Sequence, residues 1–323
     1  MSVQRVLVTL GALAAVPLFL IFYILFTESA LARGKGLSTS KVRPWIWLLP
    51  AMALLCIFLI YPTINTIILS VMNANSTAFA GLKNFAYIFT DNSMLIVLRN
   101  NLLWVVFFTL ITVTLGLLFA VLTDRVKYEA AAKALIFLPM AISFVAAGVI
   151  WKFMYEYKPA GTTQIGTVNA VLTGIFPGFQ PQAWLFNKSQ NNWALIIVGI
   201  WMWTGFSMVI LSASLKGISP ELLEAARIDG AGEFAIFFRI ILPLMKNTIA
   251  VVTTTMVINV LKIFDIVYVM TNGNLDTEVI ANRMYKEMFN YRQYGRASAL
   301  AMILLVAIVP IMLLNIKRFR REG

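Results

Sequence analysis

Seven long apolar stretches divide this chain, at residues 6–26, 45–70, 100–122, 134–155, 193–215, 247–270 and 298–316. A helix needs about 20 mostly apolar residues to cross the hydrocarbon core of a bilayer. Backbone in lipid must satisfy its own hydrogen bonds, so each stretch should be a helix. The sequence therefore predicts an all-α, polytopic membrane protein. The last six stretches form one coherent core, and the first adds an N-terminal transmembrane helix.

The composition supports this reading and limits the partners. The chain is 60% hydrophobic and only 12% charged, whereas soluble domains are about 45–50% apolar and about 25% charged. Its net charge of +12 could indicate nucleic-acid binding in a soluble protein. Here the basic residues flank apolar spans, which is typical of the positive-inside rule and of contact with anionic lipid headgroups. We therefore expect a lipid bilayer as partner and no nucleic acid.

Enzymatic and metal chemistry have few candidate residues. The chain has one cysteine, Cys56, and no histidine. Histidine is the commonest general base and metal ligand, and zinc sites draw on Cys and His. No pair of carboxylates lies inside a span. We therefore expect no catalytic site, no metal and no cofactor.

Basic residues predict the orientation in the membrane. They crowd the loop after the first span and the C-terminal tail, at Arg33, Lys35, Lys41, Arg43, Lys317, Arg318, Arg320 and Arg321. Six spans connect these two places, so both lie on the same, cytoplasmic side. The N-terminus then faces outward. The sequence Ala30-Leu31-Ala32 resembles a signal-peptidase site, but the first apolar stretch is long for a signal peptide, and we favour a retained helix over a cleaved one.

The predicted cytoplasmic loop at 216–246 carries the most specific pattern. Ser219-Pro220-Glu221 is typical of a helix start, with an N-cap, proline in the first turn and an acidic residue. The sequence continues with Glu224-Ala225-Ala226, Gly230 and then Ile240-Ile241-Leu242-Pro243. Two small alanines let a helix pack closely against a partner, and glycine permits a tight bend. Proline can end or begin the next helix. The pattern predicts a helix-turn-helix projecting from the membrane.

This pattern resembles the EAA loop of permease subunits in bacterial ABC importers, with every fixed position at its spacing. The resemblance implies that the loop docks on an ATPase subunit. The residues that it assigns to this coupling role are Glu224, Ala225, Ala226, Asp229, Gly230 and Pro243. Glu224 is expected to meet a basic group or a backbone donor there. The alternative is an ordinary solvated amphipathic loop.

Further elements extend the resemblance over residues 45–323. They are Gly81-Leu82-Lys83-Asn84-Phe85, the stretch Phe264 to Gly273, Thr277-Glu278-Val279 and Tyr294 to Ala299. Asn274 departs from the pattern, which commonly has a second glycine there. The chain is similar to maltose-type carbohydrate-uptake permeases, and most similar to those for α-glucosides. We therefore divide it into an N-terminal helix with a basic loop, residues 1–44, and a permease domain, residues 45–323, that contains the coupling loop.

The resemblance implies a non-catalytic subunit of an importer in the bacterial plasma membrane. The chain lacks the G-x-x-x-x-G-K-[ST] motif that cradles ATP phosphates, so ATP hydrolysis falls to a separate nucleotide-binding subunit. An extracytoplasmic solute-binding protein and a second permease complete the assembly. Whether that second permease is this chain again stays open, although we expect a heterodimer. Alternative functions are a permease for glycerol phosphate or another polar solute and, less favoured, an ion-coupled secondary transporter.

Sugars are recognised by aromatic faces and polar groups on a mostly apolar wall. Trp203 and Phe206 share one face of the fifth span, and Asn259 provides an amide on the sixth. We expect these three residues to line the substrate pathway. Each also has a structural alternative, namely core packing for Phe206, an interfacial belt for Trp203 and a bond to a neighbouring helix for Asn259. For Lys262 and Asp265 we favour a structural role.

Overall fold

The computed structural model describes residues 11, 15, 17–19, 21–29 and 39–322, with the backbone alone at 39–42, 314, 316 and 318–322. Two compact units divide the chain, Met1–Asn65 and Thr66–Gly323. Most of the first predicted span and the Ala30-Leu31-Ala32 site lie outside the described residues. Within the first unit, the described part of 17–29 is helical. It is followed by α2 (Thr39–Leu55), a π-helical turn η1 (Cys56–Ile60) and the start of α3 (Tyr61–Ser70).

The second unit contains helices and loops, and no strand occurs among its described residues. In order, its elements are α4 (Lys83–Thr90), α5 (Asn92–Leu103), η2 (Trp104–Phe108), α6 (Thr109–Asp124), α7 (Glu129–Phe137), η3 (Leu138–Ala141), α8 (Phe144–Met154), α9 (Thr167–Ile175), α10 (Asn191–Lys216), α11 (Pro220–Ile228), α12 (Glu233–Ile236), η4 (Phe237–Ile241), α13 (Leu242–Leu244), α14 (Lys246–Leu261), α15 (Asp265–Met270), α16 (Ile280–Tyr285), η5 (Lys286–Asn290) and α17 (Tyr294–Glu322). The predicted all-α class is confirmed.

Four predicted spans are continuous helices of sufficient length and apolarity to cross a bilayer. They run over Arg43–Ser70, Asn92–Asp124, Asn191–Lys216 and Tyr294–Leu313. These correspond to the predicted stretches at 45–70, 100–122, 193–215 and 298–316. Three of the helices, Arg43–Ser70, Asn92–Asp124 and Asn191–Lys216, are longer than the predicted stretches because polar and charged residues continue them beyond the apolar run.

The predicted span at 134–155 is wrong as a single helix. Two helices, Glu129–Ala141 and Phe144–Met154, meet at an angle of 99°. Pro139 lies near the start of η3, where its missing N–H weakens helix continuation. Ser143 then adopts an extended conformation and caps α8 by accepting a hydrogen bond from the Ala146 N–H at 3.1 Å. The proline and the capping serine inside this apolar run thus end one helix and begin the next.

The predicted span at 247–270 begins where expected, at the start of α14 (Lys246–Leu261), but it is wrong as a single helix up to residue 270. Its helix α14 ends at Leu261, where the side-chain amide of Asn101 donates to the Leu261 carbonyl at 3.1 Å. Lys262 and Asp265 therefore lie at an irregular connection to α15. At the other end, Glu233–Leu244 and Lys246–Leu261 form a pair bent by 68°, just after Pro243.

The core of the second unit is built around α10. Its apolar stretch is 67% buried, against 28% for the helix at Asn92–Asp124, and it packs along α6. Gly116 lies so close to Ser207 that a Cβ would collide with its side chain, and Gly205 is equally close to the backbone of Ile136. Small residues let membrane helices approach closely without a large hydrophobic driving force. This packing makes α10 the scaffold on which both ends of the unit are built.

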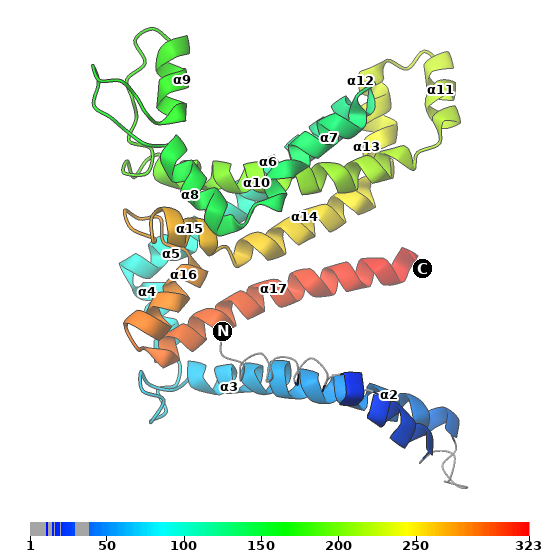
Figure 1. The fold of residues 1–323 in the computed structure, drawn as a ribbon, viewed down its shortest axis with the longest axis vertical. Coiled ribbons are helices and arrows are strands. Elements are labelled where there is room, and N and C mark those ends of the chain that lie inside the picture. Colours follow the sequence, from blue (N-terminus) through cyan, green and yellow to red (C-terminus); the bar gives the residue numbers. More distant parts are fainter. Residues whose placement is uncertain (1–10, 12–14, 16, 20, 30–38, 323) are drawn as a thin grey trace. The chain divides into compact units, whose positions relative to one another are not determined.

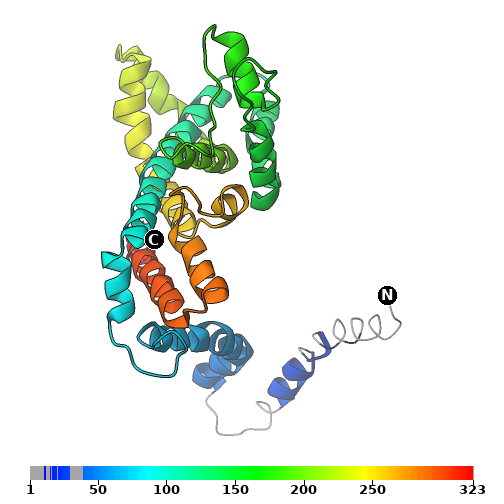
Figure 2. The same cartoon turned by 90° about the vertical axis from the view of Figure 1, so that its left-hand side faces the viewer.

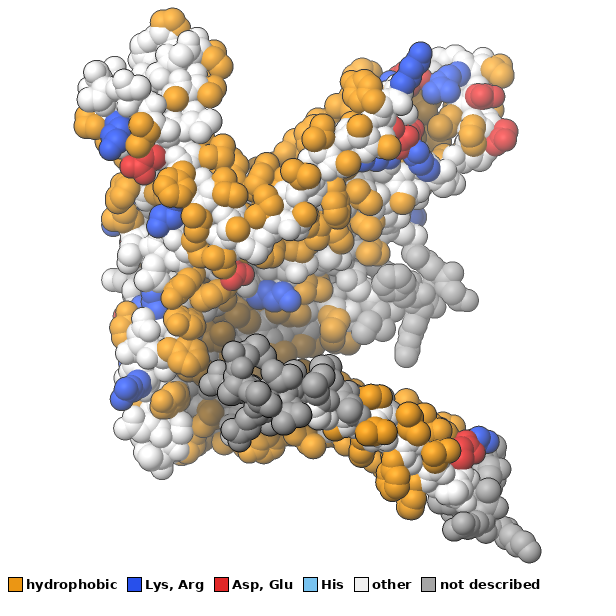
Figure 3. Space-filling model, in the orientation of Figure 1, with side chains coloured by type: hydrophobic (Ala, Val, Ile, Leu, Met, Phe, Trp, Pro, Cys, Tyr) orange, Lys and Arg blue, Asp and Glu red, His pale blue; other side chains and the backbone are white. Residues whose placement is uncertain are grey.

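Short helices lie at both ends of α10. In Figure 1, α11 and α12 lie beyond the C-terminal end of α10, whereas α9 and α15 lie toward its N-terminal end. Figure 2 shows α16 beside the first turns of α17, which it contacts. On the face drawn in Figure 3, hydrophobic side chains cover the middle of the unit, and charged ones gather where α11 and α12 lie. This distribution is expected of a bundle whose middle faces lipid.

Candidate coupling surface and solute path

The helix-turn-helix predicted from the sequence is present, and we call α11, its turn and α12 the coupling segment. Pro220 stands in the first turn of α11, and Gly230 has a φ of +83°. The N–H of Gly230 donates to the Arg227 carbonyl at 3.0 Å and that of Ala231 to the Ala226 carbonyl at 3.0 Å. This is a Schellman motif, which needs a left-handed residue at the position that Gly230 occupies.

One detail of the predicted helix start is wrong. Ser219 has the extended backbone of an N-cap but makes no capping bond to the backbone. Its hydroxyl instead donates to the Glu221 carboxylate, which lowers the pKa of that carboxyl. Pro220 removes one of the unpaired N–H groups of the first turn and its fixed φ suits a helix start, so the start of α11 does not depend on a side-chain cap.

The coupling segment presents an outward surface without internal partners. Glu224, Ala225 and Asp229 are exposed, and Glu224 has no hydrogen bond or ion pair to any described residue. Ile228 is 86% exposed and Phe234 is 82% exposed. Two apolar side chains and a free carboxylate around small alanines form a surface suited to a protein partner.

Ion pairs join the coupling segment to the transmembrane helices. The Glu233 carboxylate lies 2.9 Å from Arg227 of α11 and 2.9 Å from Arg125, directly after α6. A second group lies beside it, where Lys216 at the end of α10 is 2.7 Å from Glu129 at the start of α7. The two Glu233 pairs are largely exposed, so they add little to stability. They set the position of α11 and α12 relative to the end of α6, whereas the Lys216–Glu129 pair joins the ends of α7 and α10.

The predicted pathway residues are only partly brought together. The rings of Trp203 and Phe206 are in edge-to-face contact at 5.6 Å, and Trp203 stacks on Phe144 at 6.1 Å. Asn259 lies on α14, and its amide donates within its own helix to the Thr255 carbonyl at 2.9 Å. The structure records no contact between this amide and the two rings among the described residues.

Phe144 is a pathway candidate that the sequence reasoning missed. It is the first residue of α8, immediately after the break at Ile142 and Ser143. Irregular backbone at membrane depth is tolerated where it is buried in protein or lines a cavity. The ring contacts place Phe144 beside the two predicted pathway residues, Trp203 and Phe206, and make it a further candidate. Pro139 and Ser143 are the sequence features that could have indicated the helix break, and with it Phe144.

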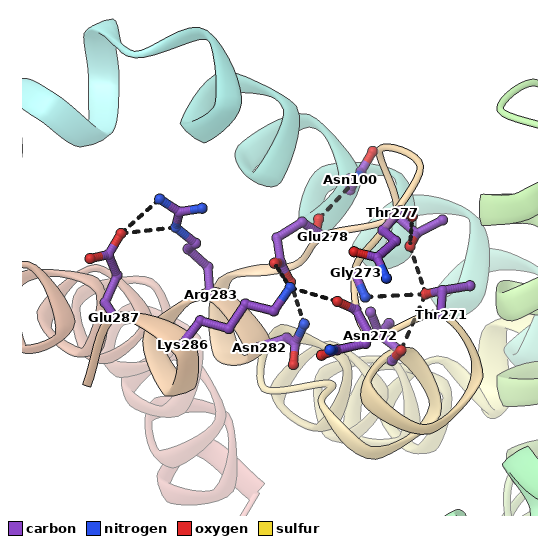
Figure 4. Close-up of polar contacts among 12 residues, drawn as sticks. Asn100, Thr271, Asn272, Gly273, Thr277, Glu278, Asn282, Arg283, Lys286 and Glu287 are labelled. Carbon is purple, nitrogen blue, oxygen red and sulfur yellow. Dashed lines mark hydrogen bonds and ion pairs between the residues drawn. The ribbon is translucent and has the colours of Figure 1, made fainter. Parts of the chain in front are cut away.

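A polar cluster at the N-terminal end of α10 was also missed (Figure 4). Lys286 and Glu278 form a buried ion pair of 2.6 Å, and Lys286 also donates to the Asn272 carbonyl at 2.5 Å. Asn282 donates to the same Glu278 carboxylate. One turn away, Arg283 pairs with Glu287 at 2.8 Å. This cluster fixes the hairpin that connects α15 to α16.

The hairpin itself is strained and held from outside. Asn272, Leu275 and Asp276 have positive φ values of 50°, 55° and 64°, and such residues cost about 1–3 kcal/mol each. Asn191 donates to the Leu275 carbonyl at 2.7 Å, and Asn100 donates to that of Asp276 at 2.7 Å. Amides from the last turn of α5 and the start of α10 thus hold a conformation that the hairpin sequence alone disfavours.

The chain matches the family described as the binding-protein-dependent transport system inner membrane component over residues 112–321. That range contains the core helix α10, the whole coupling segment and the polar cluster. This protein belongs to that family. The predicted family, the all-α membrane fold and the inner-membrane location are thereby confirmed, and the chain is a permease component of an ABC-type transport system.

Two curated relatives resemble this permease over most of their length. The osmoprotective compounds uptake permease protein GgtC of Synechocystis is 57% identical over 277 residues, which are 86% of this chain and 99% of the relative. The alpha-glucoside transport system permease protein AglF of Rhizobium meliloti is 45% identical over 285 residues, 88% of this chain and 84% of the relative. The permease is therefore similar to uptake permeases of two named specificities.

A solved structure shares the fold. A bacterial alginate ABC transporter, crystallised in complex with an alginate pentasaccharide-bound periplasmic protein, contains a chain that matches this permease with a TM-score of 0.74. The match covers 88% of this chain and 98% of that chain, at 23% identity. The likeness confirms the overall helical fold of the permease.

Proposed function

We propose that this permease forms one half of the translocation path of an ATP-driven importer and that its substrate is a sugar, with an α-glucoside as the preferred class. The observation that carries the first part is the coupling segment. It is a rigid helix-turn-helix, fixed by the Schellman turn at Gly230, and it presents the unpaired Glu224 outward. Such a surface suits a cleft on a partner subunit.

The proposed partners follow from the missing ATP-phosphate motif and from the exposed coupling segment. It carries no motif for ATP phosphates, so nucleotide-binding subunits supply the energy and the permease itself is non-catalytic. A second permease, different from this chain, completes the path as a heterodimer. An extracytoplasmic solute-binding protein delivers the substrate at the opposite end, where the long loop between α8 and α10 and the strained hairpin lie.

The membrane arrangement belongs to the same proposal. The N-terminus faces outward, the coupling segment and the C-terminus face the cytoplasm, and residues 45–323 form the permease domain after an additional helix in 1–44. The ion pair between Glu233 of the coupling segment and Arg125 at the end of α6 supports a route by which movement at the ATPase reaches the bundle.

The relatives and the path support a neutral polyhydroxylated substrate. AglF is named for α-glucosides, and the proposed path residues Trp203, Phe206 and Asn259 are uncharged. A glycerol phosphate substrate would favour arginine or lysine on the path, and the aromatic cluster offers neither. A second candidate is an osmoprotective compound, which the 57% identity to GgtC favours.

Uptake by the reconstituted complex tests the proposal. The permease, its ATPase, its second permease and its binding protein are placed in proteoliposomes with labelled maltose, sucrose, glycine betaine or glycerol 3-phosphate. We expect ATP-dependent uptake of at least one α-glucoside and none of glycerol 3-phosphate. Uptake of glycine betaine alone would transfer the proposal to osmoprotectants, and failure of the permease to co-purify with an ATPase would reject it.

A further inference from the structure

A cavity of about 510 Å³ lies outside the path described so far, at the end of the permease opposite the coupling segment. Its walls come from the end of α8, from the loop before α10 and from the strained hairpin after α15. Pockets of about 300–1,000 Å³ are the usual size for small organic ligands. The cavity is therefore large enough to hold one or more rings of a small saccharide.

The lining of this cavity has the chemistry of a carbohydrate site. Tyr155, Tyr157 and Phe186 provide aromatic surface, and Asn272 and Asn274 provide amides from the hairpin. Aromatic faces pack on the apolar sides of sugar rings, and amides donate to and accept from hydroxyls. Lys152 and Glu156 also line the cavity. Their opposite charges give no net preference for an anion or a cation.

Both walls are held rigid by buried amides. In the loop before α10, the fully buried Asn169 accepts hydrogen bonds from the Gln182 N–H at 3.0 Å and the Trp184 indole at 3.1 Å, and its amide donates to the Glu156 carbonyl at 3.2 Å. Across the cavity, Asn100 and Asn191 hold the hairpin. Strained backbone that its surroundings enforce concentrates at ligand sites.

We propose that this cavity is an outer saccharide-binding site, which contacts a glycosyl unit before it enters the membrane path. The proposal rests on the proposed sugar specificity and adds a second place of contact to it. A rigid aromatic and amide-lined cavity next to the entrance favours retention of a substrate that would otherwise diffuse away when it leaves its carrier.

Protection from labelling tests the site directly. In a Cys56→Ser background, Leu275→Cys, at an exposed lining residue to which no sugar contact is assigned, is introduced into the full transporter complex in nanodiscs without binding protein. We expect maltose to slow the reaction of Leu275→Cys with an impermeant maleimide in a saturable manner, and glycine betaine to leave it unchanged. Phe176→Cys, on an exposed residue after α9 that does not line the cavity, is the matched control and should react equally fast with and without maltose.

Each other outcome counts against the site. Unprotected Leu275→Cys in a complex that takes up maltose would overturn the outer site while leaving the proposed function intact. Equal protection of Phe176→Cys would show a general effect of the solute and would also overturn it. Protection by the sugar-free binding protein but not by maltose would indicate that the binding protein docks over the cavity, and it would overturn the saccharide site.

A charged residue at the edge of the cavity tests the site through the KM for uptake. Asn272→Asp keeps a side chain that tolerates a positive φ and removes one neutral donor. We expect the KM for maltose uptake to rise by about 2- to 10-fold, the range for one neutral hydrogen bond, with the maximal ATPase rate unchanged. An unchanged KM together with normal protein level would contradict the site.

Discussion

Glu233 and Arg125 form an ion pair of 2.9 Å that joins the coupling segment to the end of α6, 108 residues earlier in the chain. The same carboxylate also holds Arg227 of α11. One acidic side chain thus connects the surface that we propose to face the ATPase with a helix that packs along the core helix α10. This relationship gives the first prediction.

Replacing Glu233 by glutamine should loosen coupling without unfolding the permease. The pairs are exposed, so the protein level should stay normal. We expect less sugar transported per ATP hydrolysed, because α11 loses its fixed position against α6. Glu221→Gln is the matched control, since Glu221 bonds to its neighbour Ser219. Equal transport-to-hydrolysis ratios in the two variants and the native complex would contradict this role.

The buried pair of Glu278 and Lys286 predicts a stability effect. Removing one partner of a buried ion pair costs about 3–5 kcal/mol because the other charge is left uncompensated. Lys286→Met should therefore lower the thermal midpoint of the purified permease substantially. The double variant Glu278→Gln, Lys286→Met leaves no unpaired charge and should recover part of the loss. A double variant less stable than Lys286→Met would argue against the pairing.

The path residues predict changes in selectivity. Phe206→Ala opens the ring cluster with Trp203 and should change the relative uptake of α-glucosides of different length. Asn259→Ala removes the one amide proposed for the path and should weaken uptake of all of them. Protein level separates this from packing, because a core role for Phe206 would lower the level instead. Normal level with an unchanged sugar profile in both variants would reject the path assignment.

The orientation is tested by accessibility of the two ends. In the Cys56→Ser background, Ser2→Cys should react with an impermeant reagent added to intact cells, whereas Glu322→Cys should react only after lysis. The basic loop after the first span and the basic tail motivate both expectations. The reverse pattern, or mature protein that lacks residue 2, would refute a retained N-terminal helix facing outward.

Much of this fold is predictable from the sequence because the bilayer restricts the choices. Four spans and the turn at Gly230 follow from apolar length and from the conformational freedom of one glycine. The breaks at Ser143 and Leu261 were missed for a definable reason. Single polar residues or prolines inside a long apolar stretch do not by themselves show that a helix ends, and the groups that allow the breaks are a local cap in one case and the distant side chain of Asn101 in the other.

The outer hairpin could not be predicted at all from local sequence. Its strained conformation at Leu275 and Asp276 depends on amides that are 84 to 176 residues away in the chain, those of Asn191 and Asn100. Periodicity and turn preferences carry no information about such partners. Thr277 and Glu278 belong to a sequence element that resembles the family. Their relation to the buried Lys286, however, is seen only in the structure.

The coupling surface is the claim on which the proposed function most depends. Glu224 is exposed and unpaired among the described residues, and Gly230 supplies the turn that fixes α11. Reversing the charge at Glu224 and adding a Cβ at a φ of +83° should disrupt the fit to the ATPase. Ile228 and Phe234 remain unchanged in this variant. Any loss of uptake is therefore due to the carboxylate and the turn and not to the exposed hydrophobic side chains.

ATP-driven sugar uptake by the Glu224→Lys, Gly230→Ala variant is the most direct measurement. It is made in proteoliposomes that contain equal amounts of inserted variant or native permease. We predict that uptake falls to a small fraction of the native rate while membrane insertion stays normal. Uptake at the native rate by the fully inserted variant would contradict the account.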